Sequence, residues 1–386
     1  MIVKLGDLIN KIVGNEDRLT TSLPYFLAGE HMETSCIAIY NHGELNEKTR
    51  NTLGYQFHYP FEIGDVLFMT KNPYLKKCGY ATFEGICSIA TFVLRSKDES
   101  KLTQKFLAVL LQTDQFWDYL EANKSGSVNY FITWKTLEQY EFDLPTIEKQ
   151  NEIAEIVWAI EETRQSYKKL LKSTDELVKS RFIEMFGTIY NNVHNFNIKT
   201  LEEICEPIKD GTHQTPEYTD DTVNGYKFLS SKDVTSSKID WSNLKYIPAK
   251  LHEQLYARIA PQKGDILLAK NGTTGVAAIV DKDDIFDIYV SLALLRPKQM
   301  NSFYLWAAIN SNETKKQFDE HLKGIGVPNL HLGEIKKTEI IEPPLELQNQ
   351  FADFVQQVDK SKFELQNTMK QLDFLQRSIL AETLPA

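Results

Sequence analysis

The segment Pro145-Thr-Ile-Glu-Lys-Gln-Asn151 has a close copy 198 residues later, Pro343-Pro-Leu-Glu-Leu-Gln-Asn349. After both copies, apolar residues continue at spacings that alternate between three and four positions. This spacing is typical of a coiled-coil seam, because a repeat of 3.5 residues keeps one stripe of side chains facing a partner helix. We therefore predict a helix-pair seam with the following members: Ile153, Ile156, Ile160, Tyr167, Leu170, Leu177, Phe351, Phe354, Val358, Leu365, Leu372 and Leu375.

Each copy begins at proline and contains no glycine, which predicts one long helix in each half of the chain. The first helix is expected over about residues 148–185 and would be roughly 55 Å long. Polar residues at seam positions could fix the register, namely Thr163, Thr174, Ser361 and Thr368. Because the two copies share their register, we favour a mutual antiparallel pair over the alternative of two ordinary core helices.

The segments upstream of the two helices also correspond to each other. Gly64-Asp-Val-Leu-Phe68 matches Gly264-Asp-Ile-Leu-Leu268, and apolar strand-like runs follow at 87–95 and 289–296. Short helices are expected over 101–120 and 302–322. Strands mixed with a few helices predict an α+β fold. The predicted organisation is a pseudo-two-fold repeat of two globular domains and two long helices, with boundaries at 1–144, 145–187, 188–341 (linker and second domain) and 342–386.

The composition excludes several protein classes. The 386 residues include 43 Lys+Arg and 53 Asp+Glu, and 42% are hydrophobic, so wholesale disorder is not expected. No apolar run reaches about 18 residues, and the first segment carries Asp7 and lacks a signal-cleavage pattern. The cysteines show no CxxC spacing, which argues against a disulfide framework or a thiolate zinc site: Cys36, Cys78, Cys87 and Cys205. We expect a soluble, cytoplasmic protein with no membrane association.

Catalytic motifs are missing from the sequence. There is no GxxxxGK[ST] phosphate loop, no GxGxxG motif that opens a helix and no HExxH spacing. We therefore predict no catalytic residues, no metal site and no cofactor in this chain, and a binding role instead.

Polar, glycine-containing loops in the second domain are the best candidates for that role. Gly211 would let the backbone approach a ligand closely, and His213 and Gln214 carry donors and acceptors of the kind that read base edges. Each loop alone is most simply a surface turn, but four such loops at strand ends favour a recognition surface. The candidate DNA contacts are Lys209, Asp210, Thr212, His213, Gln214, Thr215, Ser230, Ser231, Lys232, Lys270, Asn271, Thr273, Thr274, Asn329 and His331.

The first domain has two comparable segments, in which aromatic residues lie beside lysines. Such aromatics can stack on bases, but they equally fill small cores. The candidate DNA contacts here are Lys71, Asn72, Tyr74, Lys76, Lys77, Ser125, Ser127, Asn129 and Tyr130. Because the two domains share a framework and differ in these loops, we predict that they recognise different DNA sequences.

With these motifs, the chain resembles the specificity subunits of Type I restriction–modification systems over nearly its whole length. The resemblance lies in the repeated architecture, the helix starts Ile147-Glu-Lys-Gln150 and Leu345-Glu-Leu-Gln348, and the segments Asp210-Gly-Thr-His-Gln-Thr-Pro216 and Gly264–Gly275. The first domain departs from the pattern, since it reads Met69-Thr-Lys-Asn-Pro-Tyr74 where the second reads Leu268-Ala-Lys-Asn-Gly-Thr273.

The resemblance implies that each domain reads one half of a split site in double-stranded DNA. The paired helices would act as a ruler between the halves and as a platform for two modification subunits, which methylate adenine. Restriction (motor–nuclease) subunits would join this core, and S-adenosylmethionine, ATP and Mg would be bound by the partner chains. The alternative is a coiled-coil adaptor or assembly protein whose globular domains bind protein partners.

The net charge of −10 bears on the expected DNA binding, because phosphate neutralisation dominates nucleic-acid affinity. We expect the chain alone to bind DNA weakly and to lose it readily with salt, with partner chains supplying much of the positive charge.

Overall fold

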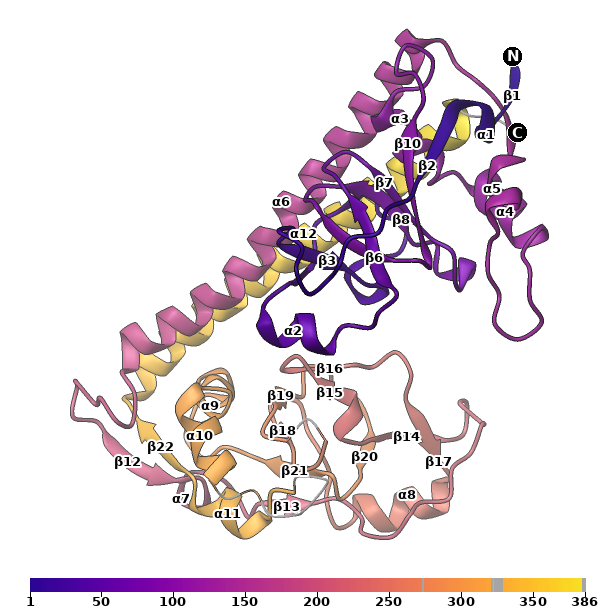
Figure 1. The fold of residues 1–386 in the computed structure, drawn as a ribbon. Helices are drawn as coiled ribbons and strands as arrows, with labels where there is room; N and C mark the ends of the chain where they lie inside the picture. Colours follow the sequence, from indigo (N-terminus) through magenta and orange to yellow (C-terminus); the bar gives the residue numbers. More distant parts are fainter. Residues whose placement is uncertain (273, 321, 323–328, 384–386) are drawn as a thin grey trace. The chain divides into compact units, whose positions relative to one another are not determined.

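The computed structural model describes residues 1–272, 274–320, 322 and 329–383 (Figure 1). The chain divides into two compact units: unit 1 contains Met1–Leu170 and Leu365–Ala386, and unit 2 contains Leu171–Glu364. Each unit therefore holds one globular domain and one half of each long helix. Among the described residues, no helix combines the length and apolar character needed to cross a membrane.

The two long helices are α6 (Ile147–Phe186) and α12 (Leu345–Thr383). They begin just after Pro145 and the Pro343-Pro344 pair, so each proline lies where the helix has no need of its missing N–H. In unit 1, Arg164 of α6 pairs with Asp373 of α12, with 2.8 Å between the nitrogen and the oxygen. In unit 2, Asp175 of α6 pairs with Lys362 of α12. From Arg164 to Asp175 the chain advances along α6 while the partner on α12 moves back from Asp373 to Lys362, which confirms the antiparallel coiled coil. The internal repeat is confirmed as well, since Arg164 and Asp175 recur 198 residues later as Lys362 and Asp373.

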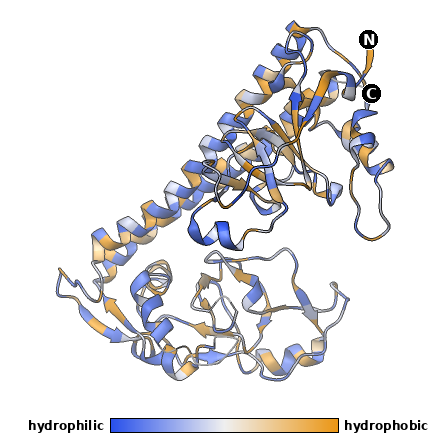
Figure 2. Cartoon of the chain, in the orientation of Figure 1, coloured by the Kyte–Doolittle hydropathy of each residue, from blue (hydrophilic) through white to orange (hydrophobic). Residues whose placement is uncertain are grey.

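The seam itself differs from the prediction. Its first positions are right, because Ile153, Ile160, Phe351 and Val358 are buried. Its second positions lie one residue later than expected, so Val157, Val178 and Val355 are buried while four predicted members are exposed: Ile156 (43%), Leu170 (47%), Leu177 (50%) and Leu375 (46%). Phe354, Tyr167, Leu365 and Leu372 are half-buried. The buried seam residues are therefore spaced four and then three positions apart, instead of three and then four. Figure 2 shows hydrophobic and hydrophilic residues alternating along both helices.

Unit 1 contains a five-stranded sheet of order β2-β10-β7-β8-β4, a four-stranded sheet of order β5-β3-β9-β6 and the two-stranded ribbon β1-β11. Its strands are β1 Ile2–Lys4, β2 Ile9–Ile12, β3 Tyr25–Leu27, β4 Ala38–Ile39, β5 Gly43–Glu44, β6 Phe57–Phe61, β7 Val66–Met69, β8 Cys78–Ala81, β9 Gly85–Ser88, β10 Thr91–Ser96 and β11 Glu141–Asp143. Its shorter helices are α1 Leu5–Leu8, α2 Glu47–Thr52, α3 Gln104–Leu110, α4 Asp114–Ala122 and α5 Trp134–Glu138, with 3₁₀ turns η1 Gly29–His31 and η2 Pro73–Leu75.

Unit 2 contains a four-stranded sheet of order β13-β21-β18-β19, a three-stranded sheet of order β17-β14-β20, and the ribbons β15-β16 and β12-β22. Its strands are β12 Asn197–Thr200, β13 Lys209–Asp210, β14 Tyr226–Leu229, β15 Val234–Thr235, β16 Lys238–Ile239, β17 Lys245–Ile247, β18 Ile266–Ala269, β19 Ala277–Ile279, β20 Phe286–Ile288, β21 Leu292–Leu295 and β22 Glu339–Glu342. Its shorter helices are α7 Leu201–Ile204, α8 Ala249–Tyr256, α9 Ser302–Ile309, α10 Asn312–Glu320 and α11 Leu332–Lys337, with the 3₁₀ turn η3 Ser231–Asp233.

The predicted α+β class is confirmed, and two details differ from expectation. The first apolar run, 87–95, spans two sheets, because β9 ends at Ser88 and β10 begins at Thr91. The second run, 289–296, holds the single strand β21, which follows a turn after β20. Each region expected to be helical holds two helices, α3 with α4 and α9 with α10. A chain that changes sheets within one run can bury both parts of it, which a count of apolar residues does not reveal.

The repeated Gly-Asp segment is a structural feature of both domains. Arg95 and Arg296, at the ends of β10 and β21, each donate two hydrogen bonds to the buried carboxylates of Asp65 and Asp265 at 2.7–2.9 Å. The preceding Gly64 has a φ of +100°, a backbone conformation that favours glycine. The repeated Gly-Asp pair therefore closes the turn before the central strand of each domain.

The glutamine at the start of each long helix is also structural. Gln150 and Gln348 are buried, and their side-chain oxygens accept the backbone N–H of Thr103 at 3.0 Å and of Asn301 at 2.9 Å. Their side-chain amides donate to the carbonyls of Pro145 and Pro343. Each glutamine thereby ties the first turn of a long helix to the start of a domain helix, α3 or α9.

Candidate nucleic-acid interface

In unit 1, the structure brings the two candidate segments of the first domain together. Lys71 follows β7 and forms a bridge with Phe131, and the N–H of Asn72 donates to the carbonyl of Tyr130 at 3.0 Å. The Lys124 amine lies 4.2 Å from the centre of the Tyr130 ring. The side chains of Lys71, Asn72, Tyr74, Ser127 and Asn129 are exposed on these segments, whereas Ser125 and Tyr130 are half-buried.

Two of the first-domain lysines make internal contacts. Lys77 donates to the carbonyl of Gly29 at 2.6 Å, and Lys76 pairs with Asp114 at 3.2 Å. These contacts occupy the amines that were predicted to reach DNA. Both lysines thus make contacts within the first domain, and their contact with DNA stays a prediction.

In unit 2, four candidate loops converge at the end of β18. Asn271 forms a bridge with Asn329, and the N–H of Leu330 donates to the carbonyl of Lys270 at 2.9 Å. The N–H of Lys270 donates to the carbonyl of Ser291, whose hydroxyl accepts the N–H of Ser231 at 2.9 Å. Thr273, which was also a candidate, lies outside the described residues.

The two loop clusters occupy equivalent places in the repeat. Ile132 donates to the carbonyl of Thr70 in unit 1 as Leu330 donates to that of Lys270 in unit 2, both at 2.9 Å. Strand pairing sets Met69 opposite Thr91 and Ala269 opposite Leu292, at matching ends of the central sheets. The structural counterpart of Lys270 is therefore Thr70, and the sequence match that aligned Lys71 with Lys270 is wrong by one residue.

Asp210 and Lys270 are internal rather than exposed. The Lys270 side chain is buried, and its amine lies 2.6 Å from the Asp210 carboxylate, so a strong ion pair joins β13 to the end of β18. Burial alone would raise the pKa of Asp210, but the hydrogen bond and charge of Lys270 outweigh it and hold that pKa below its ordinary value. In this structure the two side chains pair with each other and hold the loop between them, and their contact with DNA stays a prediction.

The remaining second-domain candidates differ in exposure. His213, Gln214, Thr215, Lys209, Lys232 and His331 are exposed, and Thr212, Ser230, Ser231, Asn271, Thr274 and Asn329 are half-buried. His331 lies at the N-cap of α11, and the Ser230 hydroxyl bonds the Asp233 carboxylate at 3.0 Å. Whether the exposed members contact bases or phosphates stays a prediction.

Two features of the interface were missed at the sequence level. The turn η1 (Gly29–His31) follows β3 in unit 1 as η3 follows β14 in unit 2, and the two strands pair in parallel with β9 and β20. The recurrence of Phe26-Leu27 as Phe228-Leu229 is the signal that would have revealed this pair of turns. Arg258, which follows α8, donates to the carbonyls of Asp210 and Gly211, and no motif marks it.

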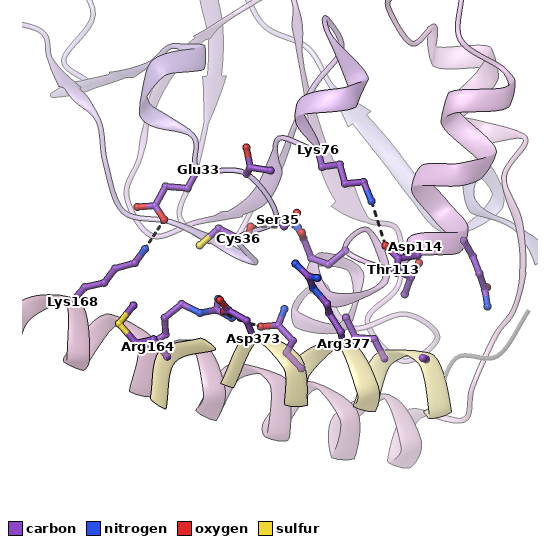
Figure 3. A pocket seen from close by; sticks show the side chains of 17 residues that line it. Glu33, Ser35, Cys36, Lys76, Thr113, Asp114, Arg164, Lys168, Asp373 and Arg377 are labelled. Atoms are coloured by element: carbon purple, nitrogen blue, oxygen red, sulfur yellow. Dashed lines mark hydrogen bonds and ion pairs between the residues drawn. The ribbon is translucent and has the colours of Figure 1, made fainter. Parts of the chain in front are cut away.

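A polar pocket of about 530 Å³ lies in unit 1 between the domain and the helix pair (Figure 3). Three of its cations pair with acids: Lys168 with Glu33, Lys76 with Asp114, and Arg164 with both Glu161 and Asp373. Because three of the four cations that line it are paired with acids, the pocket offers little free positive charge to an anion. We interpret it as the polar contact between the helix pair and the first domain.

Comparisons with known proteins agree with this architecture. The family model of the Type I restriction modification DNA specificity domain matches residues 1–173 and 194–372. A curated relative, the Type I restriction enzyme MjaVIII specificity subunit of Methanocaldococcus jannaschii, is 21% identical over 260 residues, which cover 62% of this chain and 60% of the relative. The match thus spans less than two thirds of that relative's length.

Two solved structures share the fold. One, described as showing complex assembly and conformational transition of the type I R-M system, is 20% identical, with a TM-score of 0.58 over 99% of this chain and 97% of the other. The other, the S subunit of a Type I restriction-modification system from M. genitalium, is 15% identical, with a TM-score of 0.56 over 100% of this chain and 96% of the other.

Proposed function

Because the chain belongs to the family of Type I restriction modification DNA specificity domains, we propose that it is the DNA sequence-recognition subunit of a Type I restriction–modification complex. The observation that carries the proposal is the loop cluster built twice, at equivalent ends of the central sheets, on shared backbone hydrogen bonds. The scaffold of the two clusters is the same while their side chains differ. Each domain then reads its own half of a bipartite site in double-stranded DNA, as two-fold related readers do.

The helix pair supports the second part of the proposal, which concerns spacing and assembly. Ile156, Leu170 and Leu177 recur at multiples of seven along α6, so they share one exposed face beside the seam. On α12, Phe363, Phe374 and Leu375 are exposed as well. Apolar side chains left outside a two-helix seam suit further helices from partners, and a pseudo-two-fold pair suits two copies of one partner. We assign this face to two adenine-methyltransferase (modification) subunits.

The chain itself is proposed to be non-catalytic. Methyl transfer with S-adenosylmethionine, and cleavage and translocation with ATP and Mg, would belong to the modification and restriction subunits. The family match disfavours the alternative of an adaptor whose domains bind only proteins.

The test is hydroxyl-radical footprinting of the chain in complex with its modification subunits, on DNA whose methylated sequence is found by methylome sequencing. We expect two protected stretches separated by a gap whose sequence does not matter. One continuous protected stretch would contradict the bipartite proposal. Absence of protection with folded, assembled complex would contradict DNA recognition altogether.

The ruler is tested by removing one heptad from each long helix, which keeps the seam spacing of four and three. Seven residues correspond to about 10 Å of helix, or about three base pairs of DNA. The methylated sequence should keep both half-sites and lose about three base pairs from the gap. A change in the half-sites instead would show that the helices do not set the spacing.

A further inference from the structure

We propose that His213, positioned by Asp210 and Lys270, contacts a DNA backbone phosphate in the second half-site, and that the first domain has no such contact. The inference rests on the DNA-recognition function proposed above and deepens it by assigning one contact to a phosphate. The chain has a net charge of −10, so a contact to a phosphate needs a local cation.

The anchor of this arrangement is buried. The Lys270 side chain is only 7% exposed, and its amine reaches one carboxylate oxygen of Asp210 (Oδ2) at 2.6 Å. A buried charge is stable only when it is paired, so Asp210 must remain ionised in this position. The carboxylate is thereby fixed at the foot of the loop that begins with Gly211.

The other oxygen of the same carboxylate holds His213. The distance from Asp210 Oδ1 to His213 Nε2 is 3.3 Å, and the His213 side chain is 68% exposed. A carboxylate accepts, so the proton of the neutral ring is expected on Nε2, and Nδ1 can then donate only when the ring is protonated. A donor contact from Nδ1 to a phosphate therefore requires the imidazolium.

Further cations surround the loop. Arg258 donates to the carbonyls of Asp210 and Gly211 and stays half-exposed, and the Lys209 amine donates to the carbonyl of Arg258 at 3.0 Å. Among the described residues, His213 contacts the carboxylate of Asp210, and three cations contact Asp210 or the backbone beside it: Lys209, Arg258 and Lys270. This local excess of positive charge favours a phosphate over a base edge.

The first domain cannot form the same arrangement. Lys209 pairs with Leu294 of β21, and Ile12 pairs with Val93 of β10, at matching positions of the two sheets. The residue after Ile12 is Val13, so Val13 stands where the second domain has Asp210, and Thr70 stands where it has Lys270. Neither side chain carries a charge.

The experiment measures protection of each half-site by the assembled complex between pH 5.5 and 8.5, with the duplex identified by footprinting as the probe. His213→Gln keeps a polar side chain that cannot become charged, and His194→Gln, an exposed histidine in the linker, is the matched control. In the wild type, affinity at the second half-site should fall about tenfold as the pH rises, as expected for one hydrogen bond to a charged group. The dependence should disappear in His213→Gln and persist in His194→Gln.

A second arm tests the phosphate and the positioning residues. Replacing single phosphates of the second half-site with methylphosphonates should reproduce the loss at one position in the wild type and have no further effect there in His213→Gln. Asp210→Asn should also flatten the pH profile, with Thr70→Val as a control that leaves it intact. An unchanged profile in His213→Gln, or equal losses at both half-sites, would overturn the proposal. Absent protection of both half-sites at every pH in the wild type would instead overturn the proposed function.

Discussion

The two halves of the helix pair, one in each unit, are built on equivalent positions but differ in the contacts that stabilise them. In unit 1, Glu161 is fully buried and pairs with Arg164, which also reaches Asp373 and Gln376. In unit 2, the positions 198 residues later hold Asp359 and Lys362, whose ion-pair partners Lys238 and Asp175 are both largely exposed.

The apolar contacts between the two helices show the opposite contrast, because the larger side chains lie in unit 2. In unit 2, Phe182 and Phe186 of α6 pack against Phe351 of α12, with ring centres 5.5 Å apart in both pairs. In unit 1, the α12 counterpart of Phe182 is the smaller Leu380. The helix pair is therefore held by a buried polar network in its unit 1 half and by an aromatic cluster in its unit 2 half, which shows that the repeat preserves geometry rather than chemistry.

The largest effect is expected at the buried network. Arg164→Leu would leave the Glu161 carboxylate buried without its cation, so unit 1 should lose about 3–5 kcal/mol in free energy of unfolding. The loss is measured by chemical denaturation followed with hydrogen exchange, which resolves the two units.

The matched substitution in the other half is Lys362→Leu. Its ion-pair partner Asp175 is exposed, so the cost should be at most about 1 kcal/mol. Equal losses from the two substitutions would show that the buried network is no different from a surface pair, and the contrast between the two halves would fail.

A smaller and symmetric effect is expected at the starts of the two long helices. Gln150→Leu and Gln348→Leu each remove an acceptor for a backbone N–H and a donor to a proline carbonyl, and each should cost about 1–3 kcal/mol. Thermal unfolding of the two variants should show similar decreases in Tm. Glu148→Gln, at an exposed neighbouring position, serves as the control and should leave Tm nearly unchanged. A large decrease in only one of the glutamine variants would mean that the two helix starts are not equivalent.

Much of the fold could be predicted from the sequence because the repeat supplies an internal comparison. The matching helix starts placed the bounds of α6 to within a residue of Ile147–Phe186, and the paired Gly-Asp segments located the central strands β7 and β18. The seam could not be placed correctly by counting apolar residues. Its second positions include Arg164, Lys362 and Gln376, while apolar residues such as Leu177 lie beside it on an exposed face.

The candidate site was less predictable than the fold. The strand-end loops were found because glycines and polar residues mark them, and the structure gathers them into one cluster per domain. Which side chains point outward was not encoded in any local pattern. Lys270 resembled a surface lysine because its partner Asp210 lies 60 residues earlier, and only the pairing of β13, β21 and β18 brings them together.

The smallest effect concerns the pH dependence of the second domain. The pKa of Asp210 is lowered below 3.8 in the folded state, so its ion pair contributes stability above that pH and loses it as the pH falls through the folded pKa. Val13 provides no such group in the first domain.

Protection of the β13 amides, corrected for intrinsic exchange, should therefore weaken below about pH 4 in the wild type. In Lys270→Met, burial without a cation would raise the pKa of Asp210, and protection should already be reduced at neutral pH and recover partly as the carboxyl is protonated. Thr70→Val should keep the wild-type profile, and a Lys270→Met profile that also followed the wild type would show that the pair does not hold the loop.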